Sequence, residues 1–223
     1  MSTILVLARR ELMELRRNRM VLASMVMMVC VFTWMSSGNT SEWQLLSLAA
    51  MIGIYCSYAM SGQAFIGEKI SGSIETLFCG PVSNRDIWFG KMLGTLLPSM
   101  ALSYASVGLS LLIASSRGDE ISFGLPLAVF IVIATPLIIM ASTGILGFIQ
   151  LSFDPRFVRV MSVGVIAAVF SLLTISLSIP AQGSLISWQS FALMGTLMLG
   201  LLAIPFLLVG RLSKERIVMT GGV

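Results

Sequence analysis

The sequence predicts an all-α integral membrane protein with six transmembrane helices, and three observations lead to that prediction. Of its 223 residues 57% are apolar and only 11% are charged, against about 25% charged in an average soluble domain. So few charges cannot cover the surface of a water-soluble fold, and so apolar a chain is not disordered. Six uncharged stretches are each long enough to cross ~30 Å of hydrocarbon as a helix. The cations, finally, gather on alternate connections between these stretches.

The six expected spans follow one another without a soluble domain between them. They cover about residues 20–37, 43–66, 92–115, 122–149, 157–180 and 190–210. We expect residues 1–223 to form a single transmembrane domain, with charged residues only at span ends and in connections, where the bilayer tolerates them. Pro98, Pro136 and Pro205 lie within spans and are expected to kink or locally unwind them.

The orientation of the spans follows from the count of Lys and Arg in each connection. Thirteen of the fourteen cations lie in the N-terminal segment, the second and fourth connections and the C-terminal tail, whereas the other connections contain only Arg117. Cations are enriched on the cytoplasmic side of membrane proteins, so both termini are expected in the cytoplasm. The net charge of +4 reflects this distribution, and the partner it indicates is the lipid bilayer, with no nucleic acid expected.

The segment before the first span, about residues 3–18, is predicted to form an amphipathic helix. Its apolar stripe comprises Ile4, Leu5, Ala8, Leu12 and Leu15, and its polar face comprises Arg9, Arg10, Glu14, Arg16 and Arg17. Arg10 and Glu14 are spaced as an i,i+4 ion pair. We expect the stripe at the acyl boundary and the arginines at anionic headgroups. The helix is either a simple cytoplasmic anchor or an element that transmits movement to the first span.

The connection 67–91 is the longest in the chain, and it is too long for a simple turn between helices. Gly80 and Pro81 end any helix that precedes them. Ser83 and Asp86 have the spacing of a capping box, which predicts a helix that starts at Asn84 and continues into the third span. We expect this helix to carry its first large apolar side chains into the bilayer surface; they are Ile87, Trp88 and Phe89.

The same connection resembles the cytoplasmic loop of the ABC-2 type permeases, the membrane subunits of ATP-binding-cassette exporters. The resemblance is carried by Glu68, Gly72, Ser73, Glu75 and Leu77, followed by Pro81, Ser83, Arg85, Asp86, Ile87, Gly90 and Lys91. It implies a coupling helix at Ser71–Phe78 that docks on a separate ATPase subunit. The residues implied in ATPase coupling are Glu68, Ser71, Gly72, Ile74, Glu75, Leu77, Pro81, Ser83, Asp86, Gly90 and Lys91.

The chain itself is not expected to be an enzyme. A phosphate-binding loop needs Gly, four residues and then Gly-Lys-Ser/Thr, but Gly90-Lys91 is followed by Met92 and preceded at the required position by Arg85. The chain also has no histidine, the commonest general base and metal ligand, so we expect no catalytic residue, metal or cofactor on it. The resemblance places ATP and Mg²⁺ on two copies of a partner ATPase and implies a second permease chain, identical or paralogous.

Mild polarity marks two of the spans that line the translocation route in the resembled family. The candidates are Ser57, Tyr58, Ser61 and Gln63 in the second span and Ser171, Thr174 and Ser178 in the fifth. Hydrogen bonding between helices is the alternative role for these side chains. The pairs Gly90–Gly94 and Gly144–Gly147 offer flat faces for close helix packing.

The expected function is therefore export of an amphipathic or hydrophobic substrate across the plasma membrane of a prokaryote, driven by ATP hydrolysis on the partner. Two alternatives remain open from the sequence. The chain resembles, in length and loop economy, the haem-exporter permease of cytochrome c maturation, and it could also be a six-span scaffold that transports nothing.

Overall fold

The computed structural model describes residues 3–36, 42–70, 83–118, 125–178 and 188–210, and these residues form helices without a strand. The helices are α1 (Thr3–Arg17), α2 (Arg19–Ser36), α3 (Glu42–Ser61), η1 (Gly62–Gly67), α4 (Glu68–Ile70), α6 (Asn84–Arg117), α7 (Leu125–Val129), η2 (Phe130–Ala134), α8 (Thr135–Ser152), α9 (Pro155–Ser178) and α10 (Trp188–Val209).

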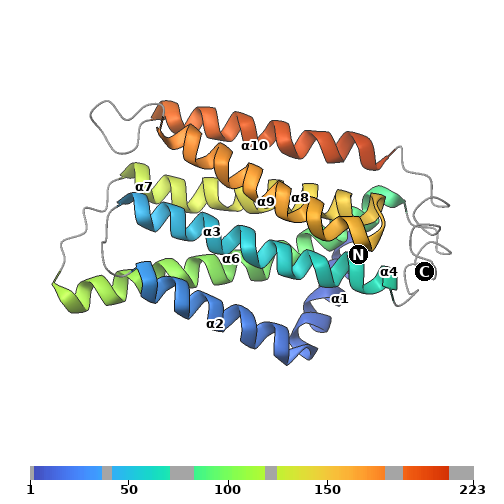
Figure 1. Ribbon diagram of the computed structural model, residues 1–223, viewed down its shortest axis with the longest axis horizontal. Helices are drawn as coiled ribbons and strands as arrows, with labels where there is room; N and C mark the ends of the chain where they lie inside the picture. Colours follow the sequence, from blue (N-terminus) through green and yellow to red (C-terminus); the bar gives the residue numbers. More distant parts are fainter. Residues whose placement is uncertain (1–2, 37–41, 71–82, 119–124, 179–187, 211–223) are drawn as a thin grey trace.

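Six helical segments of the described chain are long and apolar enough to cross a membrane, as the sequence predicts. They are Arg19–Ser36, Gln44–Ile70, Asn84–Arg117, Leu127–Ser152, Arg156–Thr174 and Phe191–Val209. These segments lie roughly alongside one another, and α2 begins at the same end of the bundle at which α10 ends (Figure 1). The fold is therefore an all-helical bundle with six candidate spans.

The second span is longer than expected. It continues through η1 and α4 to Ile70 instead of ending at residue 66. The extension places Glu68 and Lys69 on a helix, where both side chains are buried. Burial of these two charges is tolerated because each has a partner inside the protein. Glu68 forms an ion pair with Lys91, and Lys69 donates a hydrogen bond to the Phe153 carbonyl oxygen.

The start of α6 confirms the prediction of a helix beginning at Asn84. Ser83 has extended backbone angles, and its hydroxyl oxygen accepts a hydrogen bond from the Asp86 backbone N–H at 3.1 Å. The hydroxyl also donates to the Asp86 carboxylate at 2.6 Å. The first bond satisfies a backbone N–H of the first turn, which has no partner within the helix. The second bond holds the Asp86 carboxylate beside the Ser83 hydroxyl.

The direction of the first side chains on α6 differs from the prediction. Ile87 and Trp88 are buried in the protein instead of facing the bilayer surface. The Trp88 indole N–H donates to the Gly144 carbonyl oxygen at 3.2 Å, and the ring lies against Gly144 itself. A buried indole needs such an acceptor, and α8 supplies it.

The second and fourth spans each contain a wide π-helical turn, η1 in the second and η2 in the fourth. Pro136 lies in the first turn of α8, directly after η2, so the local unwinding predicted near this proline is present. Pro98 and Pro205 lie inside the helices α6 and α10, which continue past them. Wide turns of this kind occur often at functional sites.

The core of the bundle is formed by α3, α6 and α8, with η2, α9 and α10 packed against them. Gly53 on α3 admits the Ile139 side chain, and the Ser103 hydroxyl on α6 donates to the Ala49 carbonyl of α3 at 2.7 Å. Gly147 is covered by the Phe65 ring, which confirms the close packing predicted for Gly144 and Gly147. By contrast α2, α9 and α10 expose many apolar side chains on their outer faces, as lipid-facing helices do.

Candidate functional site at the charged end of the bundle

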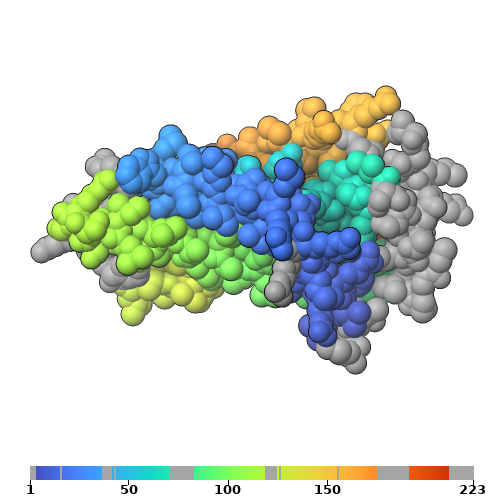
Figure 2. Space-filling model, turned by 90° about the horizontal axis from the view of Figure 1, so that it is seen from below, coloured from blue at the N-terminus to red at the C-terminus, as the bar shows by residue number. Residues whose placement is uncertain are grey.

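The helix α1 crosses the long axis of the bundle near the end where α2 begins, and it lies on the outside of the bundle (Figures 1 and 2). It packs on α6 at two glycines. A Cβ atom built on Gly90 would lie 2.7 Å from the Leu7 Cβ, and one built on Gly94 would lie 2.6 Å from the Glu11 Cβ. The flat face predicted for Gly90 and Gly94 is thus the surface of the third span on which α1 packs.

The face of α1 that is buried differs in part from the predicted apolar stripe. Ala8 is buried, as expected for the stripe, but Leu5 is 55% exposed and Glu11 is only 8% exposed. The cause is the contact with α6, which follows Leu7, Ala8 and Glu11 along one side of the helix. A carboxylate therefore occupies the centre of the buried face.

Lys91 on α6 is the partner of that carboxylate. Its side chain is 0% exposed, and its Nζ lies 2.8 Å from Glu11 Oε1 and 2.8 Å from Glu68 Oε2. It also donates to the Ala64 carbonyl oxygen in the wide turn η1. One ammonium group thus joins α1 to both the second and the third span.

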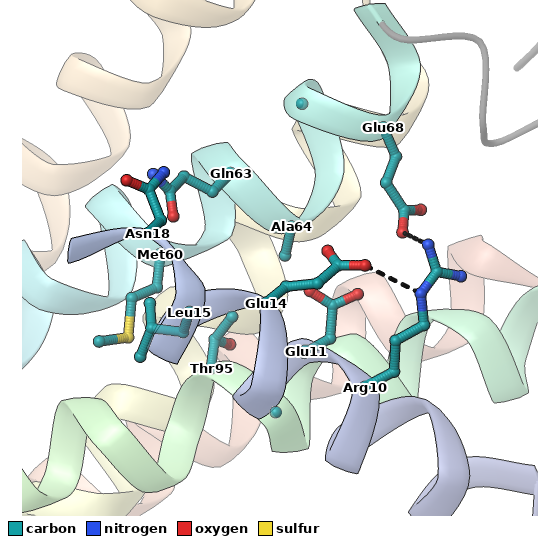
Figure 3. Close-up of a pocket in the computed structure, with 12 residues that line it drawn as sticks. Arg10, Glu11, Glu14, Leu15, Asn18, Met60, Gln63, Ala64, Glu68 and Thr95 are labelled. Carbon is teal, nitrogen blue, oxygen red and sulfur yellow. Dashed lines mark hydrogen bonds and ion pairs between the residues drawn. The ribbon is translucent and has the colours of Figure 1, made fainter. Parts of the chain in front are cut away.

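Arg10 extends these contacts into a charged cluster, which we define as Arg10, Glu11, Glu14, Glu68 and Lys91. Its guanidinium lies 3.2 Å from Glu68 Oε1 and 3.0 Å from Glu14 Oε1 (Figure 3). The second contact confirms the predicted i,i+4 pair. Arg10 and Glu14 are about half exposed, at 42% and 51%, so the cluster runs from the buried core to solvent.

Two opposing influences act on the pKa of Glu11. Burial raises the pKa of its carboxyl above the ordinary value, and the Lys91 ammonium opposes that rise. The single positive charge of Lys91 faces two buried carboxylates, Glu11 and Glu68, and an unpaired charge in a low dielectric is costly. The cluster is therefore sensitive to the loss of any one of its members.

Lys69 fixes the same end of the bundle in another direction. Its Nζ donates to the Phe153 carbonyl oxygen at 2.8 Å and to the Leu151 carbonyl oxygen at 3.4 Å. These carbonyls lie at the C-terminal end of α8, where backbone oxygens lack helical partners and attract a cation. The end of the second span is thereby tied to α8 as well as to α1 and α6.

A cavity of about 490 Å³ lies beside the charged cluster, between α1, the end of the second span and α6. Arg10, Glu11, Glu14 and Glu68 line one side of it (Figure 3). Leu15 and Met60 give it an apolar wall, and the side-chain amides of Asn18 and Gln63 lie next to each other at its other side (Figure 3). The volume is within the range of small-molecule sites.

The residues that the sequence associates with ATPase coupling fall into two groups. Glu68 and Lys91 meet in the charged cluster, Gly90 carries the contact with α1, and Ser83 and Asp86 cap α6. The others lie outside the described residues; they are Ser71, Gly72, Ile74, Glu75, Leu77 and Pro81. In α1, which the sequence predicts as an interfacial helix, Arg9 and Arg17 are exposed, and the side chain of Arg16 lies outside the described part.

The pathway candidates have different surroundings in the described part of the chain. Ser57 and Ser61 are buried, and Ser61 accepts a hydrogen bond from the Gln150 amide of α8 at 3.1 Å. Of the remaining candidates, Tyr58 is partly buried, Gln63 lines the cavity, Ser171 and Thr174 donate to carbonyls of their own helix, and the side chain of Ser178 lies outside the described part.

Two side-chain contacts near the site, those of Glu11 and Gln150, are not indicated by any sequence motif. Glu11 was not singled out because helical periodicity assigns charged residues to the solvent face; its spacing of three residues from Ala8 is the signal that could have placed it on the buried side. Gln150 was not singled out because a single amide at a span end has no motif.

No group of three or more possible metal ligands is present among the described residues.

These features define a multi-pass helical membrane protein whose second and third spans are joined to a peripheral helix by buried ion pairs. The family profile described as "ABC-2 family transporter protein" matches residues 35–152, which is just over half of the chain. The chain therefore belongs to the ABC-2 family of transporter proteins, the membrane permeases of ABC transporters. A search of curated proteins returned no match to it.

Proposed function

We propose that this chain is the permease subunit of an exporter whose ATP is hydrolysed by a separate ATPase subunit. In this proposal residues 71–78 form the coupling helix, two permease chains and two ATPase chains make the working particle, and both termini face the cytoplasm of a prokaryote. The substrate is amphipathic or hydrophobic in this proposal, because the pathway candidates on the second and fifth spans are Ser, Thr, Tyr and Gln side chains without a charge.

The observation that carries the proposal is the linkage made by Lys91. The segment 71–82 is attached to Ile70 and Ser83, so force applied to it reaches the ends of the second and third spans. Lys91 joins these two spans to each other through Glu68 and to α1 through Glu11. A displacement of the loop by an ATPase would therefore move all three helices together, because breaking the buried pairs is costly.

The direct test combines the permease with a candidate ABC ATPase from the same organism. We expect the two proteins to co-purify and the permease to change the rate of ATP hydrolysis. Glu75→Arg is expected to abolish that change, and Glu120→Arg, in the third connection, is the matched control that preserves it. A permease that neither binds the ATPase nor alters its rate would overturn the proposal and would favour a non-transporting scaffold.

A further inference from the structure

The cavity beside the charged cluster has a formal charge that its own residues do not neutralise. Glu11, Glu14 and Glu68 carry three negative charges, and Arg10 and Lys91 carry two positive charges. Among the described side chains of the cluster, one negative charge is left over. Arg9 and Arg17 on the same helix are exposed to solvent and do not line the cavity, and charges on the surface are screened by salt.

The excess charge is accessible from the open side of the cavity. Glu14 is the most exposed carboxylate of the cluster, at 51%, whereas Glu68, which also lines the cavity, and Lys91 are buried. The amides of Asn18 and Gln63 add carbonyl oxygens on the other side of the same space (Figure 3). Arg10 also lines the cavity, but its guanidinium is already held by Glu14 and Glu68. The Glu14 carboxylate and the amide oxygens of Asn18 and Gln63 remain able to accept hydrogen bonds from a ligand that carries a positive charge.

The shape and the apolar wall define the rest of the ligand. Leu15 and Met60 continue the cavity with carbon and sulfur surface, to which an alkyl chain can pack. No aromatic ring lines the cavity within the described residues, so it lacks the aromatic face with which quaternary ammonium groups are recognised. A primary ammonium, with three N–H donors, fits the acceptors better.

The space is kept open by small residues of the wide turn η1. Gly67 lines the cavity, and a Cβ atom added to it would meet no atom within 4 Å. Ala64 and Gly94 complete the wall with little bulk. The π-helical turn itself is stabilised in part by the Ala64 carbonyl, which accepts from Lys91, so the wide turn and the charged cluster support one another at this site.

We propose that this cavity binds the primary ammonium group of an amphipathic molecule, with the ammonium at Glu14 and the alkyl part along Leu15 and Met60. The source of the ammonium is either a phosphatidylethanolamine headgroup or a single-chain amine. The proposal does not require ATP-driven export, because binding is measured without an ATPase.

The test titrates the purified full chain, in a neutral polyoxyethylene detergent, with dodecylamine and counts bound molecules by native mass spectrometry. The wild type is expected to bind one dodecylamine saturably. Gly67→Leu, which fills the cavity from its open wall, and Glu14→Gln, which removes the excess charge, are each expected to weaken that binding at least tenfold. Gly62→Leu is the matched control, because Gly62 belongs to the same turn, has the same open surroundings and does not line the cavity.

Three further ligands sharpen the result. Dodecyltrimethylammonium is expected to bind the wild type more weakly than dodecylamine, and dodecyl phosphate is expected not to displace it. Displacement of dodecylamine by phosphatidylethanolamine would assign the site to a lipid headgroup, and failure to displace it would assign the site to a single-chain amine. Equal dodecylamine binding by the wild type and Gly67→Leu, or displacement by dodecyl phosphate, would overturn the proposal.

Discussion

Lys91 is the residue on which the charged end of the bundle depends, because one fully buried ammonium serves carboxylates from two other helices. A buried ion pair contributes little net stability relative to apolar packing. Removing one partner is nevertheless destabilising, because the other charge is left unpaired in a low dielectric. The residue is therefore expected to matter most through the charges that its loss would leave behind.

Replacing Lys91 with Met, which keeps most of the volume, is expected to destabilise the protein by about 3–5 kcal/mol. Thermal unfolding followed by tryptophan fluorescence in detergent measures the effect. Arg159→Met is the control, since Arg159 is an exposed cation on α9. Addition of Glu11→Gln and Glu68→Gln to Lys91→Met is expected to restore part of the stability. If Lys91→Met unfolds at the same temperature as the wild type, the ion pairs of Lys91 with Glu11 and Glu68 do not stabilise the protein.

The raised pKa of Glu11 predicts a pH dependence with a definite sign. Burial is the main cause of the rise, so the folded state binds the Glu11 proton more tightly than the unfolded chain does. Stability from this group is therefore present below the ordinary glutamate pKa and is lost as the pH rises through the raised pKa. The difference in unfolding free energy, wild type minus Glu11→Gln, is expected to fall as the pH rises above the ordinary glutamate pKa. A difference that grows with pH would mean that attraction to Lys91 outweighs burial.

At the scale of the elements, α1 is held on α6 by close approach at two glycines. Gly94→Val would bring a side chain to within 2.6 Å of Glu11 Cβ and 3.2 Å of the Ala8 carbonyl oxygen, and backbone cannot give way cheaply. We expect a loss of about 1–3 kcal/mol and faster hydrogen–deuterium exchange across residues 3–17.

Gly108→Val is the matched control for that experiment. Gly108 lies on the same helix α6, and a Cβ atom added there meets nothing within 4 Å. Its exchange in α1 is expected to equal that of the wild type. Equal exchange in Gly94→Val and Gly108→Val would show that α1 is not seated on α6 at this glycine.

The sequence predicts most of the elements and only part of the site. Six spans, a helix at 3–18, the start of α6 at Asn84 and the Arg10–Glu14 pair follow from apolar length, periodicity and capping, which are local properties. The contacts of Lys91 with Glu11 and Glu68 join positions far apart in the chain, and no local pattern encodes them. The buried Trp88 was misplaced for the same reason, because its acceptor lies on α8.

At the scale of the whole molecule, the orientation of the bundle in the membrane is a prediction from the cations. We expect Arg117→Cys to react with a membrane-impermeant thiol reagent in intact cells and Ser83→Cys to react only after permeabilisation, with the three natural cysteines replaced. The two positions flank α6, which begins and ends at opposite ends of the bundle (Figure 1). Labelling of Ser83→Cys in intact cells would show that the orientation in the membrane is the opposite of the predicted one.

The measurement that tests the account most directly is ATP hydrolysis by the assembled complex of permease and ATPase in lipid nanodiscs. Lys91→Met is expected to remain bound to the ATPase but to lose most of the permease-dependent change in hydrolysis rate, whereas Arg159→Met keeps it. The reason is that Lys91 joins α1 to the second and third spans. A folded Lys91→Met complex with the wild-type rate would contradict the claim that this cluster transmits movement of the loop to the spans.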